Sequence, residues 1–338
     1  MSLDRRKMIS LGAGSAALAM AGSAASATPA TATPTLAASA SATPRRHVPG
    51  DAELARSLSG GFRSQYAHVN GVRLHYVAGG HGPLLVLVAG WPQTWWSYRK
   101  IMPALARRYR VIAVDLRGQG GSDKPQGGYD KKTMARDIHE LVRHLGHRRT
   151  FIAGHDIGAK VAFSFAANHP DATRKVAMLD TLHPDESFYD VPLLQRPGGP
   201  FNLWWWAFNQ VHGLPEQLIQ GRSRHLIDWF LANSLHDQSL VTDFDRNVYA
   251  RTYDTPDGIR AANGWYQSFA QDIEDIKTYP KLTPPLLGLA SDQSYTAYVQ
   301  TLPKLATDVR VVRFENTVHY LQEEAPERVL REFLEFFV

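Results

Sequence analysis

Short apolar runs rich in β-branched residues alternate with helix-like patterns from Val72 to the end of the chain. Apolar strands joined by helices predict a mainly parallel sheet with helices on both faces, which binds ligands at the carboxyl ends of its strands. The 338 residues, 44% of them hydrophobic, suffice for one large α/β domain with an inserted element, or for two small domains. The predicted strands are Val72–Ala78, Leu84–Ala89, Arg110–Asp115, Thr150–His155, Val176–Asp180, Pro285–Ala290 and Val309–Phe314.

One segment interrupts this alternation. Residues 183–277 carry several helix-like patterns without a convincing strand, and they are rich in aromatic residues such as Trp204-Trp205-Trp206 and Trp265-Tyr266. We predict that this segment is a helical cap lying over the strand ends. The core would then consist of residues 60–182 and 278–338. We expect most of the cap aromatics to serve in core packing.

The first 27 residues have the three parts of a cleavable export signal. Arg5-Arg6-Lys7 forms a positive start, a small and weakly apolar stretch follows, and Ala25-Ser26-Ala27 fits a cleavage site. The paired arginines resemble the bacterial twin-arginine signal, which predicts a periplasmic or secreted protein. A disordered alanine-rich tail is the alternative. Gly and Ser dilute the apolar stretch, so we expect no stable membrane span.

Residues 28–59 are predicted to be a linker, because alanine, threonine, serine and proline dominate their first part and offer little apolar surface to bury. The formal net charge of +5 includes +2 from the leader and shows no basic stripe with interleaved aromatic residues, so no nucleic-acid partner is expected. The absence of cysteine excludes disulfides, thiolate nucleophiles and cysteine metal sites.

The segment Gly154-His155-Asp156-Ile157-Gly158 follows a predicted strand and precedes a predicted helix over Ala159–Asn168. This is the context of a nucleophile elbow, in which glycines two residues before and after the nucleophile permit a tight turn. Here the nucleophile position holds Asp156. A carboxylate needs no base to attack, and its attack on an ester would gain little, because the product is an anhydride. Attack on a carbon that carries a strained oxygen or a halide gives a stable ester, which water must then hydrolyse.

Hydrolysis of that ester requires an oxyanion hole and a general base. Trp91, which follows the Leu84–Ala89 strand, and Ile157 are placed to offer backbone N–H groups for the hole. His319 follows the last predicted strand, where this chain order places the base. Two carboxylates are candidates to orient His319: Asp180 ends the predicted strand after the elbow helix, and Asp292 follows the predicted strand Pro285–Ala290. This chemistry needs neither a metal nor a cofactor, and no His/Asp cluster has metal-ligand spacing.

Residues from about 70 to 338 resemble the epoxide-hydrolase-like and haloacid-dehalogenase-like branch of the α/β-hydrolases. The matching segments are Gly90-Trp91-Pro92-Gln93-Thr94-Trp95, Asp115-Leu116-Arg117-Gly118, Gly154-His155-Asp156-Ile157-Gly158, the tryptophan-rich run through Phe208, Leu214-Pro215-Glu216 and Trp265-Tyr266. The resemblance implies the α/β-hydrolase fold, an α/β architecture with a mostly parallel sheet of the eight-stranded type and an inserted cap. It also places the orienting acid at Asp180 in preference to Asp292. Tyr266 matches the cap tyrosine that donates to the leaving oxygen.

The chain departs from the family pattern at several positions. Ala89 stands where a histidine is usual, and Val318 where a glycine precedes the base. Ile157 and Lys160 replace the arginines that hold the substrate carboxylate in fluoroacetate-type enzymes, which argues against a dehalogenase. Trp205 occupies the second cap position, often His or Tyr, and an indole N–H is too weak an acid to deliver a proton to an epoxide.

These observations favour an epoxide hydrolase that acts on small apolar substrates to give vicinal diols. Haloalkane or haloacid dehalogenation by the same mechanism is the alternative, with Trp205, Trp206 and Tyr266 as halide donors in the pocket. A secreted binding protein that keeps the fold without turnover is an alternative of another class.

Overall fold

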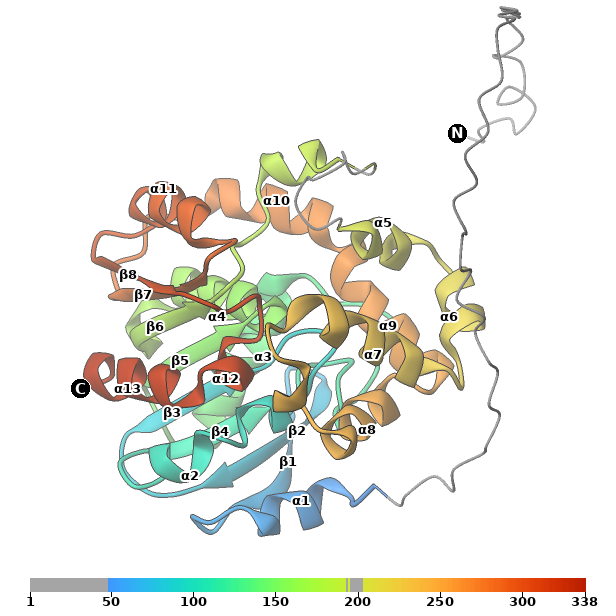
Figure 1. The fold of residues 1–338 in the computed structure, drawn as a ribbon. Helices are drawn as coiled ribbons and strands as arrows, with labels where there is room; N and C mark the ends of the chain where they lie inside the picture. Colours follow the sequence, from blue (N-terminus) through green and yellow to red (C-terminus); the bar gives the residue numbers. More distant parts are fainter. Residues whose placement is uncertain (1–47, 193, 195–202) are drawn as a thin grey trace, which may run out of the picture. The chain divides into compact units, whose positions relative to one another are not determined.

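The computed structural model describes residues 48–192, 194 and 203–338, which belong to one compact unit. The predicted export signal (residues 1–27) and residues 28–47 of the predicted linker lie outside the described residues. Figure 1 shows a central sheet with helices on both sides of it.

The sheet has eight strands in the order β1-β2-β4-β3-β5-β6-β7-β8. β2 is antiparallel to both β1 and β4, and all the other pairs are parallel. β3 is buried along its whole length, as expected of a central parallel strand covered on both faces. The strands are β1 (Arg63–Val69), β2 (Val72–Gly79), β3 (Leu84–Val88), β4 (Arg110–Val114), β5 (Thr150–His155), β6 (Thr173–Leu179), β7 (Leu286–Ser291) and β8 (Val309–Phe314).

Helices α3 and α4 pack side by side against the sheet, and α2 contacts α13 elsewhere in the core. The core helices are α1 (Asp51–Ser57), η2 (Trp95–Tyr98), α2 (Met102–Leu105), α3 (Lys131–His144), α4 (Ile157–Asn168), η3 (Pro170–Ala172), α11 (Tyr295–Leu305), α12 (Leu321–Glu324) and α13 (Pro326–Phe336). The α/β-hydrolase fold predicted from the sequence is confirmed.

Between β6 and β7, in the segment for which a cap was predicted, every described element is helical. These elements are η4 (Glu186–Asp190), α5 (Trp204–Gln210), α6 (Leu214–Ile219), α7 (Ser223–Ser234), η5 (Gln238–Leu240), α8 (Asp243–Thr252), α9 (Pro256–Gln267) and α10 (Phe269–Thr278). Figure 1 shows α5 to α9 gathered at one end of the sheet.

Two buried ion pairs fix the cap on the core. Arg99 Nη2 lies 2.9 Å from Asp245 Oδ2 of α8. Lys131 Nζ, at the start of α3, lies 2.7 Å from Asp272 Oδ2 of α10. Separating cap and core would leave Asp245 and both members of the Lys131–Asp272 pair without a partner charge in the interior, so each pair resists separation.

Two elements at the start of the folded unit were not predicted. The linker was predicted to run to residue 59, but α1 begins at Asp51, with Leu54 and Ala55 buried. Asp51 Oδ1 also lies 2.7 Å from Arg251 Nη2 of the cap, so this part of the linker prediction is wrong. β1 was not predicted, because Arg63–Val69 is an edge strand with exposed polar residues and no apolar run.

The order of the strands reverses around β3, because β4 lies on one side of it and β5 on the other. The residues after β3 and β5 therefore face each other across the topological switch point, where ligands of open α/β sheets bind. Trp91 follows β3, and Asp156 follows β5 directly. The fold thus brings two of the predicted site residues together.

Candidate active site

Asp156 forms the turn between β5 and α4, with φ 53° and ψ −120°. Side chains rarely adopt a positive φ, and such strain is typical of nucleophile elbows. A Cβ at Gly154 would collide with the Gly158 carbonyl, and a Cβ at Gly158 would collide with the Val88 carbonyl. The two glycines are therefore required by the closeness of strand and helix at this turn.

Backbone N–H groups hold one side of the Asp156 carboxylate. The Trp91 N–H donates to Oδ1 at 2.9 Å, and the Ile157 N–H also donates to this carboxylate. Both groups were predicted to form the oxyanion hole. The other oxygen, Oδ2, lies 3.9 Å from His319 Nε2 and 4.0 Å from Lys160 Nζ. The carboxylate therefore has one anchored oxygen and a second that faces the histidine.

His319 contacts one of its two candidate acids. Its Nδ1 lies 2.8 Å from Asp180 Oδ2, and the second oxygen of Asp180 accepts from Ser291 N at 2.7 Å and from the Ser294 hydroxyl. Because a carboxylate only accepts, Nδ1 carries the proton and Nε2 remains free to take one. Asp292 instead binds Arg313 Nε at 2.7 Å at the surface.

Charges around Asp156 set its ionisation and that of its neighbours. Burial alone would raise the pKa of Asp156, but the nearby Lys160 and His319 side chains hold that pKa below its usual value. Burial lowers the pKa of Lys160 to about 8, although Asp156 opposes the shift. Burial also lowers the pKa of His319, but its contact with Asp180 and the charge of Asp156 raise it above 6.5 overall.

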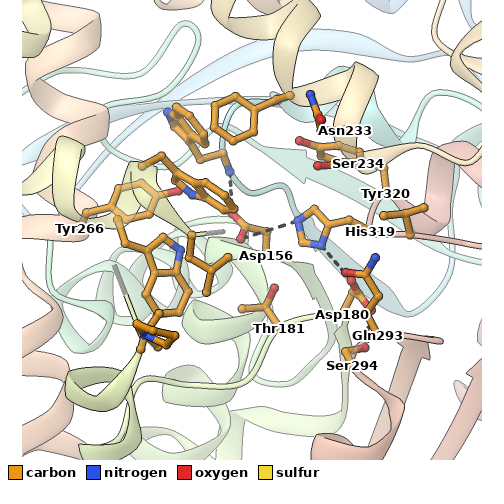
Figure 2. Close-up of a pocket in the computed structure, with 18 of the residues that line it drawn as sticks. Asp156, Asp180, Thr181, Asn233, Ser234, Tyr266, Gln293, Ser294, His319 and Tyr320 are labelled. Atoms are coloured by element: carbon orange, nitrogen blue, oxygen red, sulfur yellow. Dashed lines mark hydrogen bonds and ion pairs between the residues drawn. The ribbon is translucent and has the colours of Figure 1, made fainter. Parts of the chain in front are cut away.

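A cavity of about 590 Å³ opens onto Asp156. Figure 2 shows Asp156 between Tyr266 on one side and His319 on the other, with Asp180 beyond the imidazole. Apolar and aromatic side chains dominate the lining, and polar ones lie mainly on the His319 side. The described lining residues are Trp91, Asp156, Asp180, Thr181, Val191, Pro192, Leu194, Leu203, Trp205, Trp206, Phe230, Asn233, Ser234, Tyr266, Gln293, Ser294, Val318, His319 and Tyr320.

Tyr266 and Trp205 both line this cavity and contact each other. Burial raises the pKa of Tyr266 well above that of a free phenol, the charge of Asp156 raises it further, and a hydrogen bond from the Trp205 side chain opposes the rise. The phenol therefore stays protonated and can donate. The rings are held by edge-on contacts, Trp205 against Phe230 at 5.0 Å and Tyr266 against Trp91 at 5.7 Å between centroids.

The loop over residues 90–93, which carries the Trp91 N–H, is held by hydrogen bonds from residues that were not predicted to belong to the site. Gln119 Nε2 donates to the carbonyls of Gly90 at 3.2 Å and Gln93 at 2.7 Å. The Tyr253 hydroxyl of the cap also donates to the Gln93 carbonyl, at 3.1 Å. Gln119 follows the Asp115-Leu116-Arg117-Gly118 segment directly, and that neighbourhood was the only signal available in the sequence.

The sequence of this chain also matches a known protein family. The model of the alpha/beta hydrolase fold family matches residues 83–326, most of the described core and cap. The chain belongs to this family. Within it, the hydrolase is 33% identical over 282 residues to the soluble epoxide hydrolase of Corynebacterium sp. (strain C12), covering 80% of this chain and 96% of that protein. It is therefore an enzyme of the epoxide-hydrolase-like type.

Two further relatives differ in the reaction that their names give, since one is an epoxide hydrolase and the other a dehalogenase. The solved structure of the epoxide hydrolase CorEH without ligand superposes with a TM-score of 0.70 at 32% identity, covering 82% of this chain and 98% of that one. A fluoroacetate dehalogenase from Burkholderia sp. is 36% identical over 165 residues, covering 47% of the hydrolase and 53% of that protein. The alternative of a binding protein without turnover is not supported.

A hydrogen-bonded Ser–His–Asp chain lies elsewhere in the hydrolase, apart from the Asp156–His319–Asp180 set. Ser64 Oγ lies 2.9 Å from His75 Nε2, and His75 Nδ1 lies 2.7 Å from Asp115 Oδ2. His75 and Asp115 are fully buried, and the Tyr66 ring lies 5.1 Å from the imidazole. A leaving group cannot reach an imidazole that is sealed in this way, so we assign this chain a structural role that joins β1, β2 and the end of β4.

Within the described ranges, no group of three or more His, Asp or Glu side chains is arranged to hold a metal ion. No helix in the same part of the chain is long and apolar enough to cross a membrane.

Proposed function

We propose that this hydrolase opens epoxides through a covalent ester on Asp156 and hydrolyses the ester with water activated by His319. The observation that carries the proposal is the division of the Asp156 carboxylate: Oδ1 rests on the Trp91 N–H, and Oδ2 faces the cavity side with His319 at 3.9 Å. The relatives named as epoxide hydrolases support the substrate class.

In the first step, Oδ2 of Asp156 attacks an epoxide carbon, and the bond from that carbon to the epoxide oxygen breaks. The oxygen leaves as an alkoxide, which takes the proton of the Tyr266 hydroxyl. Tyr266 suits this task because its raised pKa keeps the proton in place until the alkoxide forms. Trp205 contributes indirectly, since its hydrogen bond orients the phenol and stabilises the phenolate that remains.

In the second step, His319 Nε2 removes a proton from water, and the hydroxide adds to the carbonyl carbon of the Asp156 ester. The ester carbonyl oxygen is Oδ1, which already rests in the oxyanion hole, so negative charge develops where the donors stand. Collapse of the tetrahedral intermediate breaks the bond between the Asp156 Cγ and Oδ2, which leaves with the alkyl group. The departing alkoxide takes the proton of the newly added hydroxyl, which releases the diol and restores the Asp156 carboxylate. The proton held by His319 returns to the phenolate of Tyr266.

The first step also prepares the base for the second. The Asp156 charge helps to raise the pKa of His319, and esterification removes that charge. The pKa of His319 therefore falls once the ester forms, which increases the fraction of neutral imidazole at the moment when a base is needed.

Dehalogenation is the second candidate, because one relative is a fluoroacetate dehalogenase and three possible halide donors line the cavity: Trp205, Trp206 and Tyr266. A haloacid substrate is disfavoured, because the buried Ile157 stands in the place of an arginine that holds the substrate carboxylate in fluoroacetate-type enzymes.

The test is a mass spectrum of the His319→Gln variant after exposure to aryl and alkyl epoxides and to haloalkanes. An epoxide adds its full mass to Asp156, whereas an alkyl halide adds its mass less that of the hydrogen halide. Asp292→Asn serves as a control that turns over without accumulating an adduct, and Asp156→Asn should take none. Absence of any adduct in His319→Gln would refute the covalent mechanism.

A further inference from the structure

Glu324, the last residue of α12, accepts hydrogen bonds from the loop that carries His319. The Val318 N–H donates to its two oxygens at 3.0 and 3.2 Å, and the His319 N–H donates to Oε1 at 3.0 Å. A charged acceptor makes each of these bonds stronger than a bond between neutral groups. The backbone at the general base is therefore held by one carboxylate.

The same carboxylate reaches the cap. The His236 N–H, in the loop between α7 and η5, donates to Glu324 Oε2 at 2.8 Å. The preceding residue, Glu323, is buried and contacts Arg99 at 2.6 Å and Tyr249 of α8 at 2.6 Å. Glu323 and Glu324, at the end of α12, therefore contact the loop that carries His319, the core and the cap.

We propose that Glu324 is a positioning residue for ester hydrolysis, which holds His319 at the distance from Asp156 that the water-activating step needs. This inference rests on the proposed function. Val318 takes the place of the glycine usual before the base, and it lines the cavity next to His319. The hydrogen bonds from the Val318 and His319 backbone N–H groups to Glu324 hold the loop at this position.

The expected effect falls on one of the two chemical steps. Formation of the ester uses Asp156 and Tyr266, neither of which contacts Glu324. Hydrolysis uses His319 Nε2, and a shift of about 1 Å in a catalytic group can cost about 100-fold in rate. Glu324→Ala should therefore slow hydrolysis about 10- to 100-fold while ester formation changes less than about threefold.

The conservative variant separates positioning from general loss of structure. Glu324→Gln retains one oxygen, which can still accept from the Val318 and His319 N–H groups, and it loses the acceptor for His236. We expect this variant to recover most of the hydrolysis rate. Glu327→Ala, at an exposed position at the start of α13, is the matched control and should leave both steps unchanged.

The experiment follows the mass of the protein by rapid quenching after mixing with an aryl epoxide, which gives the rates of ester formation and ester loss. A second measurement titrates His319 by NMR without substrate. Displacement of the imidazole from Asp180 should lower the pKa of His319 in Glu324→Ala and leave it unchanged in Glu327→Ala.

Two results in Glu324→Ala would overturn the inference. The first is that both steps slow equally, and the second is that neither the hydrolysis rate nor the His319 titration changes. If no ester forms on the unmodified protein, the proposed function fails, and the titration alone then decides whether Glu324 positions His319.

Discussion

Asp180 Oδ2 lies 2.8 Å from His319 Nδ1, whereas Asp292, the other candidate acid, binds Arg313 and the Asn316 N–H at the surface. Asp180 is almost fully buried, and its remaining oxygen is satisfied by Ser291 and Ser294. A buried and fully bonded carboxylate holds an imidazole in one tautomer, with Nε2 available as a base.

Replacing Asp180 by asparagine should slow ester hydrolysis by about 10³- to 10⁴-fold, because the amide favours the wrong tautomer of the imidazole. The ester on Asp156 should accumulate as it does in His319→Gln. Asp292→Asn is the matched control and should retain hydrolysis within about threefold, as expected of a surface substitution. The rates of ester formation and loss check both variants, and the reverse ranking would move the acid to Asp292.

The hydrogen bond between Trp205 and Tyr266 predicts that Trp205 affects the leaving oxygen only through the Tyr266 hydroxyl. Tyr266→Phe removes the donor to the leaving oxygen and should slow ester formation from an epoxide about 10²- to 10⁴-fold. Trp205→Phe should slow it less, about 10-fold, because only the support of the phenol is lost.

In the Tyr266→Phe background, Trp205→Phe should have almost no further effect, since the hydroxyl on which the indole acts is absent. Single-turnover rates of ester formation in the four proteins complete this double-mutant cycle. Additive losses would show instead that Trp205 contacts the leaving group directly.

The parts of the site that the sequence could predict are those attached to strand ends. Asp156, Asp180 and the His319 loop follow β5, β6 and β8, and a parallel sheet aligns the carboxyl ends of its strands at one edge. A local motif plus the strand order was therefore enough to bring them together. The roles assigned to them remain predictions.

The other parts depend on contacts between segments far apart in the chain. Glu324 bonds His236, and Gln119 bonds Gly90, but neither pair is marked by a spacing or a motif. α1 was missed for a related reason, because the short Asp51–Ser57 segment gains its stability from burial of Leu54 and Ala55 in the core. Local patterns do not encode such tertiary contacts.

The charges around Asp156 predict the pH dependence of each step. Hydrolysis needs neutral His319, so the rate of ester loss should rise with pH and level off above the pKa that His319 has in the ester form. In the free enzyme the pKa of His319 lies above 6.5. Because esterification removes the Asp156 charge, the acid limb for ester loss should lie at lower pH than the titration of His319 in the free enzyme.

Ester formation needs ionised Asp156, and Lys160 is the first of the charges that lower its pKa against burial. Lys160→Met should therefore raise the pKa of Asp156 and shift the acid limb of ester formation to higher pH. Lys160→Arg, which keeps the charge, is the control and should leave that limb in place. Identical pH profiles in the two variants would contradict the assignment of Lys160.

We also propose that the first 27 residues, which lie outside the described residues, direct export and are removed. Protein collected outside the cytoplasm should then begin close to Thr28, as determined by N-terminal sequencing. Replacing both Arg5 and Arg6 by lysine should block export by the twin-arginine route, whereas Lys7→Arg should not. Exported protein that still begins at Met1 would refute the cleavage.

The cavity lining predicts a preference for uncharged substrates. Among the described lining residues, Asp156 and Asp180 are carboxylates, His319, Tyr266 and Tyr320 are the other titratable residues, and no lysine or arginine is present. A substrate carboxylate would therefore meet Asp156 without a lysine or arginine of the lining to neutralise it. Like charges in contact disfavour binding by more than about 1.4 kcal/mol, which corresponds to a factor of 10. A neutral aryl epoxide should therefore exceed its carboxylate-bearing analogue at least about 10-fold in kcat/KM, and haloacetates should be poor substrates. Ile157→Arg, which places a cation directly after the nucleophile, should narrow this ratio by improving only the charged substrate. Equal kcat/KM values for the two epoxides in the unmodified enzyme would show that another group neutralises the carboxylate.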